Sequence, residues 1–210
     1  MVLPFPNEIW LDIFHGLAKE GEYDALERCR VVCRDFQLMA QDCLLRDMRF
    51  KNTEDVERIK VDVSGGEMRR WRGPRHVFIG GGNWNDGRQS IPYLATFASR
   101  FGGRWPSVEA LDISKAVWRA ADLDADAVFW DLARFPSITS LSLSDVMLPT
   151  ILTLGRLVCA FPRLKELSLS DVQFTRQPFE ASTISQFRLL PRTQLETLML
   201  YSGSAPTPSF

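Results

Sequence analysis

The chain has 210 residues, of which 45% are hydrophobic and 24% charged, and its formal net charge is −1. This composition is typical of one or two soluble globular domains, and the charge gives no overall reason to bind nucleic acid or a membrane. We expect no signal peptide, because no basic region precedes an apolar core, and the best apolar run, 151–161, is broken by Arg156 and too short to span a bilayer.

The first predicted element is an amphipathic helix that starts near Pro6, where proline is tolerated because its missing N–H would be unpaired anyway. Its wide apolar stripe is formed by Ile9, Trp10, Ile13, Phe14 and Leu17. A second helix is expected through 26–36 and a third through 38–45. Three short helices in roughly 45 residues make a small core, so we expect surplus apolar surface to meet a partner.

Two runs in this region, FPNEIWLDIF from Phe5 and LERCRVVCRDF from Leu26, resemble an F-box in the form common in fungal proteins. The resemblance covers residues 5–48 and implies docking on a Skp-type adaptor, which links such proteins to a cullin–RING ubiquitin ligase. The chain has Phe-Pro where the family usually has Leu-Pro, and its 18–25 loop is longer. Carried over by position, the adaptor-binding residues are Phe5, Pro6, Ile9, Ile13, Leu26 and Val32. The alternative is that these residues fill the module's own core, which periodicity alone does not decide.

The four cysteines fall on predicted apolar helix faces: Cys29, Cys33, Cys43 and Cys159. They are expected to be reduced core residues of a cytoplasmic or nuclear protein. Cys29 and Cys33 lie one helical turn apart, but no second pair has ligand spacing, so no metal site is predicted.

Residues 49–75 are predicted to connect the module to the rest of the chain. A short apolar pattern around 56–63 is followed by Gly65-Gly66 and by four arginines at 69–75 that surround Trp71. A basic cluster with one tryptophan is compatible with nucleic-acid contact. Without a recognisable binding fold, we expect a solvated linker with one anchoring aromatic, and no nucleic-acid partner.

From residue 76 the chain repeats itself. The clearest copies are FPSITSLSLSDVML from Phe135 and FPRLKELSLSDVQF from Phe161, and further copies begin at Trp105 and Leu190. The alternating pairs that predict strands with one buried face are Val77/Ile79, Leu111/Ile113, Leu141/Leu143, Leu167/Leu169 and Leu198/Leu200. Helices are expected at 91–101, 125–135, 149–161 and 184–190. The alternative is an ordinary α/β domain whose copies arose by chance.

A strand and a helix repeated at intervals of roughly 30 residues resemble a leucine-rich repeat solenoid. The resemblance covers 76–201 and implies a parallel sheet on the concave side. Val146 and Val172 replace the family's asparagine, so apolar packing is expected to hold the turns. The predicted fold is therefore α/β, with an F-box-like docking module at 5–48, a connector at 49–75, a solenoid at 76–201 and a flexible tail at 202–210. No capping unit follows the last strand, so we expect its edge to be open or covered by a partner.

No group of residues predicts catalysis. The two histidines, His15 and His76, stand outside any known motif, and the sequence has neither a nucleophile elbow nor a metalloprotease motif. The glycine run at 80–82 lacks the lysine that a phosphate loop requires. We therefore expect no enzyme activity and no cofactor.

Binding is the function that remains. The residues between the buried leucines face the concave side, and its middle is rich in serine, which either binds a substrate or only keeps the sheet soluble. The larger candidates for substrate contact are Phe78, Trp84, Asp112, Glu166, Met199 and Tyr201, with Trp118 as a further loop candidate.

The two resemblances together predict a substrate-recognition subunit of a Skp–cullin–F-box ubiquitin ligase, with an unidentified protein as its substrate. The alternative is a non-catalytic leucine-rich scaffold or regulatory protein outside ubiquitin ligation, whose module packs on its own solenoid. That alternative predicts apolar contacts around Trp71 and no exposed stripe on the first helix.

Overall fold

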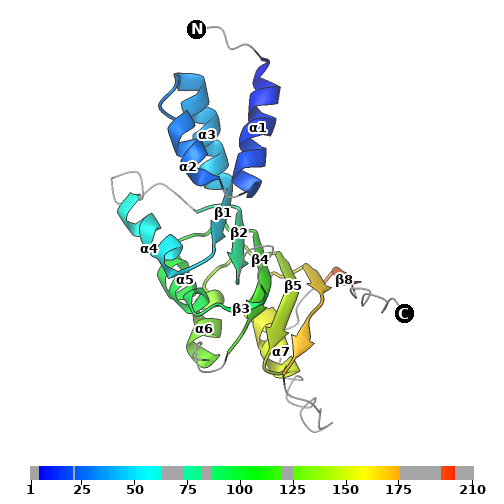
Figure 1. Ribbon diagram of the computed structural model, residues 1–210. Coiled ribbons are helices and arrows are strands. Elements are labelled where there is room, and N and C mark those ends of the chain that lie inside the picture. Colours follow the sequence, from blue (N-terminus) through cyan, green and yellow to red (C-terminus); the bar gives the residue numbers. More distant parts are fainter. Residues whose placement is uncertain are drawn as a thin grey trace, which may run out of the picture.

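The computed structural model describes residues 5–20, 22–62, 73–81, 87–119, 125–175 and 195–201. The helices are α1 (Asn7–Glu20), α2 (Tyr23–Cys29), α3 (Arg34–Arg46), α4 (Thr53–Asp62), α5 (Tyr93–Phe101), α6 (Ala125–Leu132) and α7 (Ile151–Cys159). The strands are β1 (Asp47–Phe50), β2 (His76–Gly80), β3 (Gln89–Ser90), β4 (Ala110–Val117), β5 (Ser140–Leu148), β6 (Glu166–Ser170), β7 (Gln173–Phe174) and β8 (Thr197–Tyr201). Figure 1 shows α1, α2 and α3 as a group that projects from the β1 end of the sheet.

The described strands form one eight-stranded sheet in which every pairing is parallel. The main path, β1-β2-β4-β5-β6-β8, follows the order of the chain, while β3 pairs with β4 and β7 with β5. The expectation of an α/β fold with a parallel sheet is therefore confirmed. Parallel neighbours require crossover connections, which α5, α6 and α7 supply on one side of the sheet.

One face of the sheet packs against these helices and forms the main core. The strand residues in it are Val77, Ile79, Leu111, Ile113, Leu141, Leu143 and Leu167, and the helix residues include Leu94, Phe97, Phe101, Val128, Leu132, Leu154 and Leu157. Each predicted pair of alternating apolar residues lies in an observed strand. The helices predicted at 91–101, 125–135 and 149–161 are confirmed as α5, α6 and α7, with ends that differ by no more than one turn. The expected helix at 184–190 and the tail at 202–210 lie outside the described residues.

The same bend recurs at the end of three successive strand segments. Lys115, Asp145 and Asp171 have left-handed backbone, with φ of 50°, 56° and 51°. Aspartate tolerates this region better than most residues, because its short side chain bonds locally. The residue that follows each aspartate is apolar. Val146 is fully buried, and Val172 is half-buried and packs against the core. The expectation that apolar packing holds these turns is confirmed at both positions.

A backbone hydrogen-bond pattern also recurs from one unit to the next. The carbonyl oxygen just before a strand accepts two N–H groups of the following unit, at distances of 2.8–3.1 Å. The acceptors are Arg75, Glu109, Thr139 and Lys165, and the donor pairs are Glu109/Ala110, Thr139/Ser140, Lys165/Glu166 and Glu196/Thr197. Each step from β2 to β8 thus has the same local geometry.

The three N-terminal helices have a core of their own, distinct from the main core. It is formed by Phe14, Ala18, Leu26, Phe36, Ala40 and Cys43. The predicted second helix differs from the observed one, since α2 ends at Cys29 and the backbone of Cys33 is extended before α3 begins. The β-branched pair Val31-Val32 lies in this break, where helix propensity is low.

The sheet begins earlier in the chain than expected. β1 follows α3 directly and pairs with β2, whereas the sequence predicts that its residues belong to the end of the module and to the connector. α4 also lies within the predicted connector, and Phe50 and Val56 are buried in the main core. The first part of 49–75 is therefore structural rather than a solvated linker. Trp71 and Arg69, Arg70 and Arg72 lie outside the described residues.

Candidate protein-binding surfaces

Helix α1 carries more apolar side chains than the module's core can bury. Phe14 and Ala18 face inward and are buried, whereas Phe5, Ile9 and Ile13 are 52%, 45% and 41% exposed. The spacing of four residues places Ile9 and Ile13 on one side of the helix, and Phe5 lies just before its first turn. Apolar side chains that remain in water along a whole helix face are a common sign of an interaction surface.

The turn after α2 and the start of α3 add further exposed apolar side chains. Val31 is 86% exposed, and Val32 and Leu38 are also exposed. Together with Phe5, Ile9 and Ile13 they form what we call the module's apolar set. Trp10 of α1 contacts both Phe5 and the core residue Phe36 of α3, with ring centroids 5.7 and 4.6 Å away.

Five of the six residues expected to bind an adaptor are exposed: Phe5, Pro6, Ile9, Ile13 and Val32. Leu26 is fully buried between α1, α2 and α3, so it belongs to the module's core, as the alternative interpretation allowed. Sequence reasoning missed Val31 and Leu38. Helical spacing was extended through residues 30–33, and the break there changes which side chains point outward.

The second surface is the face of the sheet opposite the helices, which we call the open face. The register aligns its residues in three rows: His76, Ala110, Ser140, Glu166 and Thr197; Phe78, Asp112, Ser142, Ser168 and Met199; Gly80, Ser114, Ser144, Ser170 and Tyr201. All except Ala110 are at least partly exposed. The predicted concave residues therefore do share one face, and small side chains form its centre.

Charged and aromatic side chains gather at the β1–β2 end of the open face. His76 Nδ1 lies 3.1 Å from the carboxylate of Asp47, and the guanidinium of Arg49 lies 4.6 Å from the ring centroid of Phe78. Burial raises the pKa of Asp112 above its usual value, and His76, a hydrogen bond from Ser142 and Arg49 oppose this in decreasing order. This end of the face is therefore able to make specific polar contacts.

A pocket of about 190 Å³ is lined by the end of α1 and by residues of or next to β1, β2, β4 and β5. Its lining residues are Glu20, Arg49, Phe50, Lys51, Phe78, Gly80, Ser114, Lys115, Ser144 and Asp145. The lining combines two aromatic rings, two serines and five charged side chains. Sequence reasoning missed Arg49 and Lys51, because β1 was not predicted to join the sheet.

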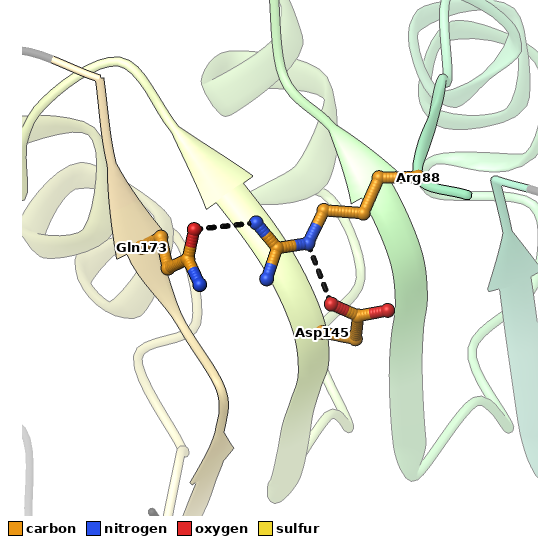
Figure 2. A network of polar contacts seen from close by, with 3 residues as sticks. All are labelled: Arg88, Asp145 and Gln173. Carbon is orange, nitrogen blue, oxygen red and sulfur yellow. Dashed lines mark hydrogen bonds and ion pairs between the residues drawn. The ribbon is translucent and has the colours of Figure 1, made fainter. Parts of the chain in front are cut away.

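The wall of this pocket is fixed by a polar network at the Asp145 bend within β5, shown in Figure 2. Arg88 Nε donates to the carboxylate of Asp145 at 2.5 Å, and its NH1 donates to Gln173 at 2.7 Å. The arginine side chain thus reaches from the segment before β3 to β5 and β7. It holds the Asp145 carboxylate in place and offsets its charge.

The residues expected to bind a substrate are not all brought together. Phe78 lines the pocket, and Asp112 is next to it in the register. Glu166 is exposed on β6, which β4 and β5 separate from β2, and Met199 and Tyr201 are exposed on β8, one strand farther away. They belong to the other end of the open face.

Trp84 and Trp118 are the two tryptophans expected to contact a substrate from loops. Trp118 is 3% exposed and stacks on Phe129, with ring centroids 5.6 Å apart, so it is a core residue and does not reach a surface. Trp84 lies outside the described residues. The apolar side chains of β8, Leu198 and Leu200, are exposed.

Comparison with protein-family models finds no match, and neither does a search of curated proteins. Within the described ranges, no group of three or more potential ligands is placed to hold a metal ion. No described helix is long and apolar enough to cross a membrane.

Proposed function

We propose that the chain is a substrate-recognition subunit of a Skp–cullin–F-box ubiquitin ligase. The helices α1 to α3 act as an F-box-like module that binds a Skp-type adaptor, and the sheet acts as a leucine-rich-repeat-like solenoid that holds a protein substrate. The subunit performs no chemistry itself. The observation that carries the proposal is the exposed row of Phe5, Ile9 and Ile13 beside a module core that is already complete.

Phe5, Ile9 and Ile13 also provide free energy for binding a partner. Covering an exposed aliphatic or aromatic side chain is worth about 1 kcal/mol or more, so the module's apolar set supplies several kcal/mol to a partner that matches its shape. A stable interface buries about 1,600 Å² in total, which is an area that three short helices can present from one side. Because the sequence resembles an F-box, the partner that we propose for this surface is a Skp-type adaptor.

The recurring backbone geometry from β2 to β8 supports the second half of the proposal. Each unit repeats the same paired hydrogen bonds and the same parallel register, as stacked repeats do. The helices cover only one face, so the open face remains available to a substrate. Holding adaptor and substrate on one chain accelerates ubiquitin transfer by raising their effective concentration.

The second candidate function is a non-catalytic leucine-rich scaffold or regulatory protein outside ubiquitin ligation. If the module packed on its own sheet, the outer face of α1 would be covered by later segments of the chain. Ile9 and Ile13 instead remain 45% and 41% exposed. This exposure favours a separate partner for the module over an internal contact.

The test is capture of a purified Skp-type adaptor by the full chain and by Ile9→Asp. Because the exposed site accepts a carboxylate in the free protein but an interface would bury it unpaired, we expect binding to fall by about a hundredfold or more. The matched control is Trp130→Asp on α6, where a 76% exposed apolar residue outside the module is replaced in the same way. Thermal melting of both variants checks that the fold is retained. Full adaptor binding by a folded Ile9→Asp variant would refute the proposal.

A further inference from the structure

The pocket at the β1 end of the open face has an excess of positive charge. Arg49, Lys51 and Lys115 contribute three cations to its lining, against the carboxylates of Glu20 and Asp145. The Asp145 carboxylate already accepts a 2.5 Å hydrogen bond from Arg88, which is not part of the lining. The lining therefore carries one cation more than it has carboxylates, so the pocket favours an anion.

The lining also offers neutral hydrogen-bond donors. Ser114 of β4 and Ser144 of β5 are register partners, so they lie side by side on the open face, and both residues line the pocket. Arg49 Nε is buried and has no hydrogen-bond partner among the described residues. A buried donor without an acceptor costs about 1–3 kcal/mol, which an incoming anionic oxygen near the guanidinium would reduce.

The volume of the pocket limits the size of the anionic group that can enter it. About 190 Å³ is smaller than the roughly 300 Å³ at which small-molecule sites begin, so the pocket accommodates one side chain rather than a free metabolite. Next to it, the serines of β5 and β6 leave a low surface on which an extended backbone fits. A single-stranded nucleic acid would need a basic track with aromatic stacking surfaces, and the open face carries serines there instead.

We propose that this pocket binds an anionic side chain of an extended acidic peptide in the substrate. Arg49 and Lys51 supply the charge, Ser114 and Ser144 supply hydroxyl donors, and Phe78 contacts the aliphatic part of the side chain. The inference deepens the proposed function, because it gives the chemical class of the segment that the subunit recognises.

The experiment measures fluorescence anisotropy of short labelled glycine–serine peptides with the full chain at low salt. The probes carry at their centre a pair of glutamates, a pair of glutamines or a phosphoserine. We expect the glutamate peptide to bind about tenfold more tightly than the glutamine peptide, because a charge-assisted hydrogen bond is lost in the latter. Arg49→Gln should weaken the glutamate peptide about tenfold, whereas Arg163→Gln, an exposed arginine in the turn before β6, should not.

Lys51→Gln is the second variant, because Lys51 is exposed and its loss leaves the Arg49–Phe78 contact intact. It should weaken the glutamate peptide several-fold and reduce the salt dependence of binding. Tighter binding of the phosphoserine peptide would support the anion site and assign a phosphate as its source. Equal binding of the glutamate and glutamine peptides, absence of binding, or unchanged affinity in both variants would overturn the inference.

Adaptor capture separates this inference from the proposed function. Ile9→Asp should lose the adaptor and keep the glutamate peptide, since Ile9 is not part of the pocket. A chain that binds the adaptor but no peptide would overturn the pocket assignment alone.

Discussion

Phe50 joins the N-terminal module to the sheet, so its removal provides a sharp test of how the two are coupled. It ends β1, is 1% exposed, and its ring lies 5.3, 6.3 and 6.4 Å from the rings of Phe97, Phe101 and Trp105. Phe50→Ala should therefore leave a cavity and destabilise the sheet by about 3–5 kcal/mol, a large part of the roughly 5–15 kcal/mol that holds a domain together.

The module should respond differently, because its core is a separate set of residues that does not include Phe50. We expect hydrogen exchange to accelerate in β1, β2 and α5 while α1 stays protected, and adaptor affinity to change less than about twofold. The control is Phe78→Ala on the neighbouring strand, where the ring lies half-buried on the open face. Urea unfolding should show a loss of only about 1 kcal/mol there. Equal losses in the two variants, or equally faster exchange in α1, would refute the separation into two cores.

Two further predictions concern the sheet itself. Burial raises the pKa of Asp112 above 3.8, so the folded chain binds this proton more tightly than the unfolded chain, and stability falls as the pH rises through and beyond that value. Asp112→Asn should accordingly be more stable than the parent at neutral pH, by a margin that disappears near about pH 3 in urea titrations; an equal margin at both pH values would contradict the assignment. Gly81→Ala should lower the unfolding free energy by about 1–3 kcal/mol, because a Cβ at this position would lie 2.3 Å from the backbone oxygen of Lys115 and 2.6 Å from that of Gln89. Gly87, where nothing lies within 4 Å, provides the matched Gly→Ala control, which should leave the midpoint of unfolding nearly unchanged.

The strands from β2 onward were predictable because their pattern is redundant. Leu141/Leu143 and Leu167/Leu169 alternate within near-identical segments, and a buried sheet face permits only one register for such pairs. β1 offers no comparable signal, since Met48 and Phe50 are a single apolar pair directly after a helix. A strand of four residues becomes recognisable only when its neighbour in the sheet is known.

The candidate sites were predictable in part for the same reason. Helical spacing identified Ile9 and Ile13, and it placed Leu26 among the same candidates because periodicity does not show which neighbour a helix face meets. The cations of the pocket lay beyond sequence reasoning. Arg49 and Lys51 depend on β1 joining the sheet, and the position of Lys115 depends on a left-handed residue at the strand bend.

The direct passage from α3 to β1 has a practical consequence for anyone who grafts this module onto another protein. Arg46 ends the helix and Asp47 already pairs with His76, so no spare residue separates the two. A chimera cut at residue 46 would end the grafted module at the last residue of α3 and leave β1 behind on the sheet of this chain. The transplanted piece therefore has to include Asp47–Phe50, and the recipient has to offer a parallel edge that accepts them.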